Sequence, residues 1–428
     1  MPVVIRPAGP ARRMTTGTER GEIRMPFQGL PGPNSTLTLL DEGSYTLAGA
    51  VGFLILWVQD TLTMQTEIEL KSTSRKLPER SNRSQEKIAH NVDGSPTFPA
   101  LPQIISLFCG AGGLDWGFHK EGFNIPLAID ISPAAIRTHK RNFVDTQSVA
   151  ADLIELGSHG VLKLAKQLIP AKTRIGVIGG PPCQGFSRAN TGSTADDPRN
   201  QLPERYLEIV RQLKEHYEVE FVVFENVLGI RDKKHANTYQ SILRGLDELG
   251  FRITEKELCA LDFGVPQNRR RIVLSAMRKQ RGYSQVIPQK RSGLSTVREA
   301  IGDLAAPAFF SRHLDPADIP VHENHWTMQP KSPRFSNPGP PHADGRSFKQ
   351  LSWDQPSPTI AFGHREIYVH PSGTRRLSIY ESMLLQGFPK EFALEGNLSE
   401  QVEQVSNAVP PPLAQKIAAA LKLALSGE

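Results

Sequence analysis

The stretch Arg174–Ser187, RIGVIGGPPCQGFS, carries the strongest indication of both fold and chemistry in this chain. Its first five residues form a short, largely apolar run that is typical of a buried strand. Cys183 follows just beyond the strand end, between a double proline and a glutamine, where a thiol is poorly placed for core packing. Open α/β sheets bind ligands outside the carboxyl ends of their strands. Cys183 is therefore a candidate nucleophile rather than an inert core cysteine.

A second strand pattern, at 219–224, supplies the other half of the chemistry. This run is mostly apolar and ends in Glu225, Asn226 and Val227. A carboxyl group so placed is expected to lose hydration, which would raise its pKa and keep a proton available. A thiol and a carboxyl group at neighbouring strand ends suit a nucleophile and a proton donor that face one substrate.

Composition limits the classes of protein to consider. The 428 residues suffice for two or three domains, and the net charge of +6 permits a nucleic-acid partner without demonstrating one. The three cysteines are far apart and form no CxxC pair, which argues against disulfides and against a Cys-rich zinc site. His322 and His325 have no such pair beside them, so we expect no metal. A reducing, cytoplasmic location fits this cysteine usage.

Residues 1–100 differ from the rest of the chain in composition and are predicted to be an N-terminal extension with little regular structure. The uncharged run Leu47–Val58 is too short to span a membrane, so no membrane association is expected. Met64 opens a more conventional polar leader. One hypothesis is that translation starts at or near Met64; the other is a genuine extension that includes a short docked helix.

From residue 101 the pattern is an alternation of strands and helices, which predicts a mostly parallel, doubly wound α/β sheet covered on both faces. The pattern fades over 280–372, where basic and aromatic residues intersperse with proline and glycine, and helical patterning returns within 373–428. Strands are expected at 103–108, 125–129, 174–178, 219–224, 251–258 and 271–276, and helices at 114–121, 133–142, 203–216, 238–249, 378–385 and 412–425.

A glycine-rich turn follows the first predicted strand, in SLFCGAGGLDWGF, Ser106–Phe118. Glycine lets the backbone approach a ligand closely, although such turns also occur without one. Asp130 ends the second strand at the spacing from the glycines that suits hydrogen bonds from ribose hydroxyls. Asp152 is placed to bind an adenine amino group, with a helix cap as the alternative. Together they favour a nucleoside cofactor, and the lack of a P-loop lysine disfavours a triphosphate.

Three arginines, 269–271, precede the strand at 271–276. Side chains alternate along a strand, so Arg269 and Arg271 are expected on one side of it. Two guanidinium groups facing a cleft can hold a phosphate or a base carbonyl, whereas the simpler alternative is a solvated charge run.

These segments and their order along the chain resemble those of the DNA (cytosine-5) methyltransferases, in the undivided bacterial arrangement. The resemblance covers roughly residues 102–425. Ser406 stands where the family usually has glycine, and a position that requires positive φ would strain a serine. The matching segments are Ser106–Phe118, Asp130, Asp152, Gly179–Ser187, Asp197–Asn200, Glu225–Val227, Gln267–Arg271, Pro356–Thr359, Arg376–Pro389 and Ser406–Pro411.

This resemblance implies an S-adenosylmethionine-dependent fold, with catalysis in 101–279, a target-recognition domain at 280–372 and a return to the catalytic domain over 373–428. It implies methyl transfer to carbon 5 of a flipped-out cytosine in a specific short DNA sequence, with restriction-modification as the setting and a monomer as the default. Implied catalytic residues are Cys183, Glu225, Arg269 and Arg271. Implied cofactor-binding residues are Phe108, Gly110, Gly112, Asp130, Asp152 and Asn407, and implied DNA-binding residues are Gln184, Ser187 and Thr359.

Two other readings remain. A transfer-RNA cytosine methyltransferase shares the core segments but carries a Cys-Phe-Thr tripeptide, which this sequence lacks. A non-catalytic DNA-binding module would not need Cys183, Glu225 and both arginines intact. A separate restriction endonuclease is a possible companion that the sequence does not identify.

Overall fold

A computed structural model describes residues 100–182, 201–291, 293, 295–311, 313–336, 349–360 and 368–426. The predictions for residues 1–99, including the run Leu47–Val58, lie outside these ranges. Within the described part of the chain, no helix is long and apolar enough to cross a membrane.

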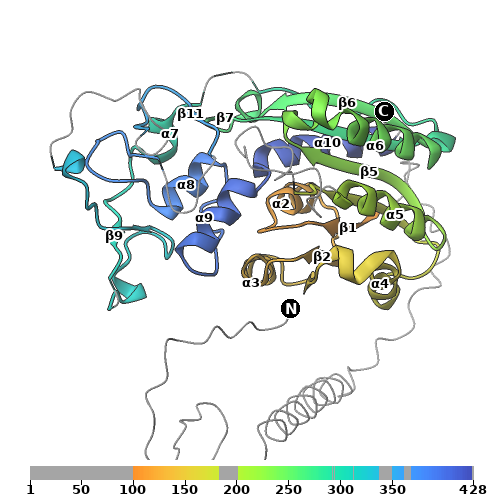
Figure 1. The fold of residues 1–428 in the computed structure, drawn as a ribbon, viewed down its shortest axis with the longest axis horizontal. Coiled ribbons are helices and arrows are strands. Elements are labelled where there is room, and N and C mark those ends of the chain that lie inside the picture. Colours follow the sequence, from red (N-terminus) through yellow and green to blue (C-terminus); the bar gives the residue numbers. More distant parts are fainter. Residues whose placement is uncertain are drawn as a thin grey trace, which may run out of the picture. The chain divides into compact units, whose positions relative to one another are not determined.

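A seven-stranded sheet forms the centre of this fold, in the order β3-β2-β1-β4-β5-β8-β6 (Figure 1). All its neighbouring strands pair in parallel except β8, which runs antiparallel to both β5 and β6. The predicted α/β class with a mostly parallel sheet is therefore confirmed. The strands are β1 (Gln103–Leu107), β2 (Leu127–Asp130), β3 (Gln147–Ala150), β4 (Arg174–Gly179), β5 (Glu218–Asn226), β6 (Phe251–Cys259) and β8 (Arg270–Arg278).

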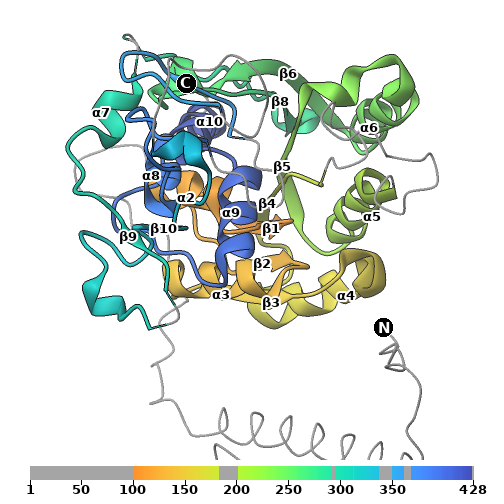
Figure 2. The ribbon, with the colours of Figure 1, turned by 60° about the vertical axis from the view of Figure 1, so that its left-hand side comes forward.

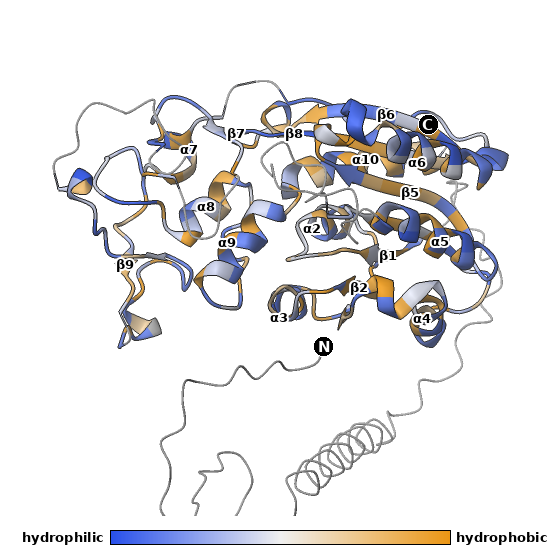
Figure 3. Ribbon diagram, in the orientation of Figure 1, coloured by the Kyte–Doolittle hydropathy of each residue, from blue (hydrophilic) through white to orange (hydrophobic). Residues whose placement is uncertain are grey.

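Helices cover both faces of the sheet because successive strand side chains point to opposite faces. In β1, Ile105 packs with α4 (Leu153–Leu168), α5 (Leu202–Lys214) and α6 (Ala236–Glu248). Ile104 packs instead with α2 (Gly113–Lys120) and α10 (Pro411–Ser426). Figure 2 shows α5 and α6 on one side of the sheet and α2 and α10 on the other, and Figure 3 shows the apolar character of the strands between them.

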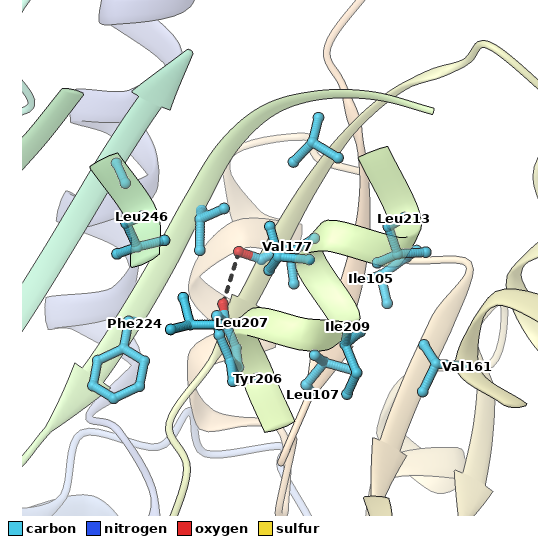
Figure 4. Packing of buried hydrophobic residues seen from close by; sticks show 14 of the residues in the cluster. Ile105, Leu107, Val161, Val177, Tyr206, Leu207, Ile209, Leu213, Phe224 and Leu246 are labelled. Atoms are coloured by element: carbon cyan, nitrogen blue, oxygen red, sulfur yellow. Dashed lines mark hydrogen bonds between the residues drawn. The ribbon is translucent and has the colours of Figure 1, made fainter. Parts of the chain in front are cut away.

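One tyrosine ties the helical layer to the strands. Tyr206 in α5 is fully buried, and its hydroxyl lies 3.2 Å from the Val177 carbonyl in β4 (Figure 4) and 2.9 Å from the Val223 carbonyl in β5, so that both carbonyls share its proton. The hydroxyl is thus satisfied inside an apolar cluster, where an unpaired polar group would be costly. These contacts hold α5 on the two strands that lead to the segments of Cys183 and Glu225.

Two regular elements, the edge strand β3 and the helix α4, were missed by the sequence patterns. In β3 only Ser148 is buried, so this edge strand has no apolar run to reveal it. In α4, Gly157 has φ 63° and ψ 174°, which interrupts the helix and its apolar period. The predicted helix at 133–142 agrees with α3 (Pro133–Asn142), which begins with a Ser132 cap and a proline in its first turn.

The remaining described elements form a smaller region. Its cluster of buried side chains joins α7 (Val297–Ile301), α8 (Ile379–Leu385) and α9 (Leu398–Asn407) with Ala111 and Phe143 beside the main sheet. Short parallel pairs complete it: β9 (Ala308–Phe309) with β10 (Trp326–Thr327), and β11 (Ser357–Pro358) with β7 (Gln267–Asn268). The second pair places a segment of this region beside β7, which directly precedes the arginine strand β8.

Candidate active site at the carboxyl ends of the strands

Glu225 lies near the end of β5 and is 8% exposed. Arg271 in β8 places its Nε 3.1 Å from Glu225 Oε1. Loss of hydration on burial raises the pKa of Glu225, while the charges of Arg271 and Arg269 act in the opposite direction. The net direction is upward, as predicted, so the carboxyl group retains its proton to a higher pH than an exposed glutamate.

The side chains of Arg269 and Arg271 point to one side of the chain and that of Arg270 to the other, because successive side chains alternate. Arg269 is almost fully buried, its Nη1 donates to the Ile360 carbonyl at 3.5 Å, and its charge acts on Glu225. Arg270 points the other way, is mostly exposed, and donates to Glu257 at 3.2 Å. Arg269 and Arg271 therefore act on the same carboxyl group, whereas Arg270 belongs to the surface.

The segment that leads to Cys183 lies directly against Glu225. A Cβ at Gly180 would sit 2.8 Å from Glu225 Oε2, so a larger residue would displace the carboxyl group or this segment. Asn226 Nδ2 donates to the carbonyl of Pro181, the residue after Gly180, at 3.2 Å and so holds this segment in place. Cys183 itself, with Gln184 and Ser187, lies outside the described residues. Gly180 and Pro181 nevertheless bring the chain beside Glu225 and Asn226, two residues before Cys183.

The glycine turn adopts the left-handed backbone conformation at three of the predicted positions. Phe108, Gly110 and Gly112 have φ values of 55°, 53° and 94°. A Cβ on Gly110 would meet nothing within 4 Å, whereas one on Gly112 would lie 2.4 Å from the Phe143 ring. The backbone at Gly110 therefore borders open space, and Gly112 is required for packing.

Asp130 is joined to this turn by a direct hydrogen bond. Its Oδ2 accepts from the Gly110 amide and its Oδ1 from the Ser132 amide, both at 2.8 Å. Loss of hydration raises the pKa of Asp130 despite these bonds. Each carboxylate oxygen has a second lone pair, so both can accept further hydrogen bonds from a ligand.

Asp152 and Asn407 lie beside this edge of the sheet. Asp152 follows β3, which pairs with β2, and caps α4 by accepting from the Ile154 amide at 2.8 Å. The structure thus bears out the helix-cap alternative, in which Oδ1 of Asp152 caps the helix. Asn407 is the exposed last residue of α9, whose Glu403 acts electrostatically on Asp130. Ser406 lies within α9 without positive φ, so the strain considered for serine is not found.

A buried hydrogen-bond network beneath the turn was not predicted. Asp115 accepts from Ser106 Oγ at 2.6 Å and lies 2.8 Å from His139 Nε2, while His139 Nδ1 lies 2.8 Å from Ser148 Oγ. The Cys109 thiol lies within 4.8 Å of these groups, and burial raises its pKa well above the usual value. With a protonated thiol and both imidazole nitrogens engaged, the cluster fits a structural network better than a metal centre.

Ile131 is a second feature that sequence patterns missed. It directly follows Asp130 but is 64% exposed. The signal was available in principle, because an apolar residue after a strand end has no place in the sheet core. An exposed aliphatic side chain beside Asp130 offers a surface for a flat, apolar ring.

Thr359 connects the smaller region to the arginine strand. Its Oγ1 donates to the Asn268 carbonyl at 2.8 Å, directly after the β7–β11 pairing of Gln267 with Ser357. Thr359 is therefore hydrogen-bonded to the residue that directly precedes Arg269.

Comparison with known proteins adds evolutionary evidence to this geometry. The family model for C-5 cytosine-specific DNA methylases matches residues 102–423. The chain is 35% identical over 332 residues to the Type II methyltransferase M1.HphI of Haemophilus parahaemolyticus, covering 74% of this chain and 86% of that protein. It is 30% identical over 347 residues to M.MthTI of Methanothermobacter thermautotrophicus, covering 76% and 98%.

Solved structures agree on the fold. The crystal structure of a putative DNA modification methyltransferase encoded within an E. coli prophage matches with a TM-score of 0.62 at 24% identity, covering 76% of this chain and 99% of that one. At this identity the likeness supports the architecture alone.

Proposed function

Because the chain belongs to the C-5 cytosine-specific DNA methylases and is a DNA (cytosine-5) methyltransferase, we propose that it acts on a flipped-out cytosine through a covalent Cys183 adduct. The observation that carries this proposal is the carboxyl group of Glu225, whose pKa burial raises and which lies between Arg271 and the segment that leads to Cys183. A cytosine ring in a stacked duplex does not reach so enclosed a group, so the base must leave the helix.

In the proposed reaction, the Cys183 thiolate forms a bond to cytosine carbon 6. The displaced ring electrons move toward nitrogen 3, which takes the proton of Glu225. Carbon 5 becomes nucleophilic and would take the methyl group from the sulfonium sulfur of S-adenosylmethionine, whose methyl–sulfur bond breaks to leave a neutral sulfide. Loss of the carbon-5 proton to a base, expulsion of the thiolate and return of the nitrogen-3 proton to Glu225 restore the ring.

Arg271 and Arg269 have two roles in this scheme. They hold the base and the adjacent backbone by hydrogen bonds from their guanidinium groups. They also stabilise the Glu225 carboxylate that forms when its proton moves to the base, since both charges act on this group.

The turn at Phe108–Gly112 and the carboxylate of Asp130 fit S-adenosylmethionine, which supplies the methyl group when bound. Gly110 borders open space, and Asp130 retains lone pairs for ribose hydroxyls. Ile131 offers an apolar surface for the adenine ring, and the remaining Asp152 oxygen can accept from the adenine amino group. Asn407 completes this set of predicted residues.

Sequence-specific recognition is proposed for residues 280–372, with Thr359 contacting the DNA backbone. Gln184 and Ser187 are proposed to contact DNA from the segment that carries Cys183. By analogy with the Type II relatives, we propose a restriction-modification setting with a separate endonuclease, and a monomer as the acting form.

Bisulfite sequencing of DNA from a methylation-free host that expresses the full chain tests the activity. We expect protected cytosines within one recurrent short sequence. Cys183→Ala should abolish protection, whereas Cys259→Ala, which removes a buried thiol at the end of β6, should retain it. Scattered protection without a common sequence would contradict specific recognition.

The covalent adduct has a separate test. DNA containing 5-fluorocytosine carries no removable proton at carbon 5, so the ring cannot be restored after methyl transfer. We expect a protein–DNA complex that survives denaturation with the wild-type chain and not with Cys183→Ala. Turnover without a trapped complex would refute the adduct.

A further inference from the structure

We propose that Gln267 and Gln386 form a buried relay that couples the base-binding arginine strand to the cofactor-binding segment. The relay consists of these two side-chain amides and the backbone groups of Ile360 and Ala408 that they bind. It deepens the proposed function, on which it rests, and makes both glutamines positioning residues for the two substrates.

The first part of the relay anchors the arginine strand. Gln267 Oε1 accepts from the Ile360 amide at 3.2 Å, and Arg269 Nη1 donates to the carbonyl of the same residue at 3.5 Å. Both polar groups of Ile360 are thus held by Gln267 and Arg269, which are two residues apart. The position of Arg269 is thereby tied to the orientation of the Gln267 amide.

The second part runs from Gln267 to the cofactor side. Gln267 Nε2 donates to Gln386 Oε1 at 2.6 Å and to the Leu385 carbonyl at 3.3 Å. Gln386 Nε2 then donates to the Ala408 carbonyl at 2.6 Å. Ala408 directly follows Asn407, so the relay ends beside a predicted cofactor-binding residue.

Close packing makes the Ala408 end sensitive to displacement. A Cβ on Gly113, at the start of α2, would lie 2.3 Å from the Val409 carbonyl and 3.1 Å from Ala408 Cβ. A Cβ on Gly387, directly after Gln386, would lie 2.8 Å from Pro412. A shift of residues 407–409 therefore moves against the helix that begins at the glycine turn.

Burial prevents water from replacing these hydrogen bonds. Gln267 and Gln386 are both fully buried, so no bulk water reaches the groups that a substitution would leave unpaired. Such a network specifies one arrangement of the segments that it joins. We therefore expect its loss to disturb both binding sites, although neither glutamine lies on the glycine turn.

The test compares Gln267→Met, Gln386→Met and the double variant, in the full chain, with a matched control. Methionine keeps the length of the side chain without its amide. The control is Gln404→Met, because Gln404 is buried in α9 close to Asn407, but its Nε2 binds only the Glu395 carbonyl, outside the relay. The readouts are the dissociation constant for S-adenosylmethionine by calorimetry, kcat and KM on unmethylated DNA, and Tm.

We expect each relay variant to weaken S-adenosylmethionine binding about five- to tenfold, the ratio that corresponds to the loss of one hydrogen bond, and to lower kcat. The decisive case is Gln267→Met, since Gln267 lies in β7, two residues before Arg269. The double variant should lose less affinity than the two single losses combined, because the bond between the glutamines is lost only once. Gln404→Met should bind S-adenosylmethionine as the wild-type chain does.

Wild-type affinity in Gln267→Met, or in Gln386→Met if Gln267→Met fails to fold, would overturn the relay while leaving the proposed function intact. An equal loss in Gln404→Met would do the same, because the effect would then be general destabilisation. Absence of S-adenosylmethionine binding by the wild-type chain would overturn the proposed function, and the relay with it.

Discussion

Arg271 Nε lies 3.1 Å from Glu225 Oε1, and this ion pair joins the neighbouring strands β8 and β5 where their side chains meet the candidate active site. The pair is unusual in that burial still raises the pKa of Glu225 despite the adjacent charge. A carboxyl group with a raised pKa can donate a proton, and the adjacent arginine charges stabilise the carboxylate that remains. Several measurable consequences come from this balance.

Replacement of Glu225 by glutamine should lower methyl transfer about 100-fold or more, because an amide can donate a hydrogen bond to ring nitrogen 3 but not a proton. The near-isosteric change should leave the dissociation constant for S-adenosylmethionine unchanged. Single-turnover transfer of labelled methyl groups to DNA measures the first effect and calorimetry the second. Full activity in Glu225→Gln would show that proton transfer from this residue is dispensable.

The raised pKa of Glu225 also affects stability. The folded chain holds this proton to a higher pH than the unfolded chain, so the stabilising contribution is complete below the unfolded value, near 4.5, and is lost as pH rises through the folded value. Glu225→Gln lacks this dependence. Its free energy of unfolding relative to wild type should therefore increase over that window, as measured by urea unfolding at several pH values; a constant difference would contradict the raised pKa.

Removal of the Arg271 charge should raise the pKa of Glu225 further, because Arg271 lowers this pKa more than Arg269 does. Glu225 would then keep its proton to higher pH, and the alkaline fall in rate that Glu225 causes should move upward in Arg271→Ala. Arg271→Lys, which retains the charge, should shift the profile less. The residual rate of each variant, followed against pH, tests this order, and a downward shift in Arg271→Ala would refute it.

Gly180→Ala would place a methyl group 2.8 Å from Glu225 Oε2, so either the carboxyl group or the Pro181 segment must move. We expect a fall in kcat of about tenfold or more with unchanged S-adenosylmethionine affinity, since small displacements of reacting groups are costly. The comparison of kcat with the dissociation constant checks this separation. An unaltered kcat would mean that the contact between Gly180 and Glu225 does not position the catalytic groups.

Gly117→Ala should destabilise the fold without touching the site. The added Cβ would lie 2.3 Å from the Gln415 backbone nitrogen and force α2 and α10 apart, at a cost of about 1–3 kcal/mol. Gly160→Ala is the matched control, because its Cβ meets only the movable side chain of Leu156. Urea unfolding of both variants measures the difference, and equal stabilities would contradict the close packing of α2 on α10.

Much of the sheet was predictable because it depends on local patterns. The apolar run before Glu225 indicated its strand, and the spacing from the glycine turn to Asp130 indicated two adjacent strand ends. Where the apolar pattern is absent, prediction failed, as with the edge strand β3 and the interrupted helix α4. The roles of Cys183, Gln184 and Ser187 remain predictions, since these residues lie outside the described ranges.

The contacts that organise the site were not predictable in the same way. Gln267 and Gln386 are separated by 119 residues, and Asp115 and His139 by 24. No periodicity or propensity reports which polar groups at such separations will meet. The same residues are compatible with solvated loops until packing removes the water around them.

The sequence by itself determined the α/β class, the order of the chemically important segments and the family, because strand periodicity and short segments of distinctive residues are local properties. Only the tertiary structure decided that Arg271 and Arg269 share Glu225 while Arg270 faces solvent, and that the buried side chains of Gln267 and Gln386 are hydrogen-bonded to each other. The reason is physical: the pKa of a carboxyl group and the partners of a buried amide depend on burial and on neighbours, and both exist only after the chain has packed.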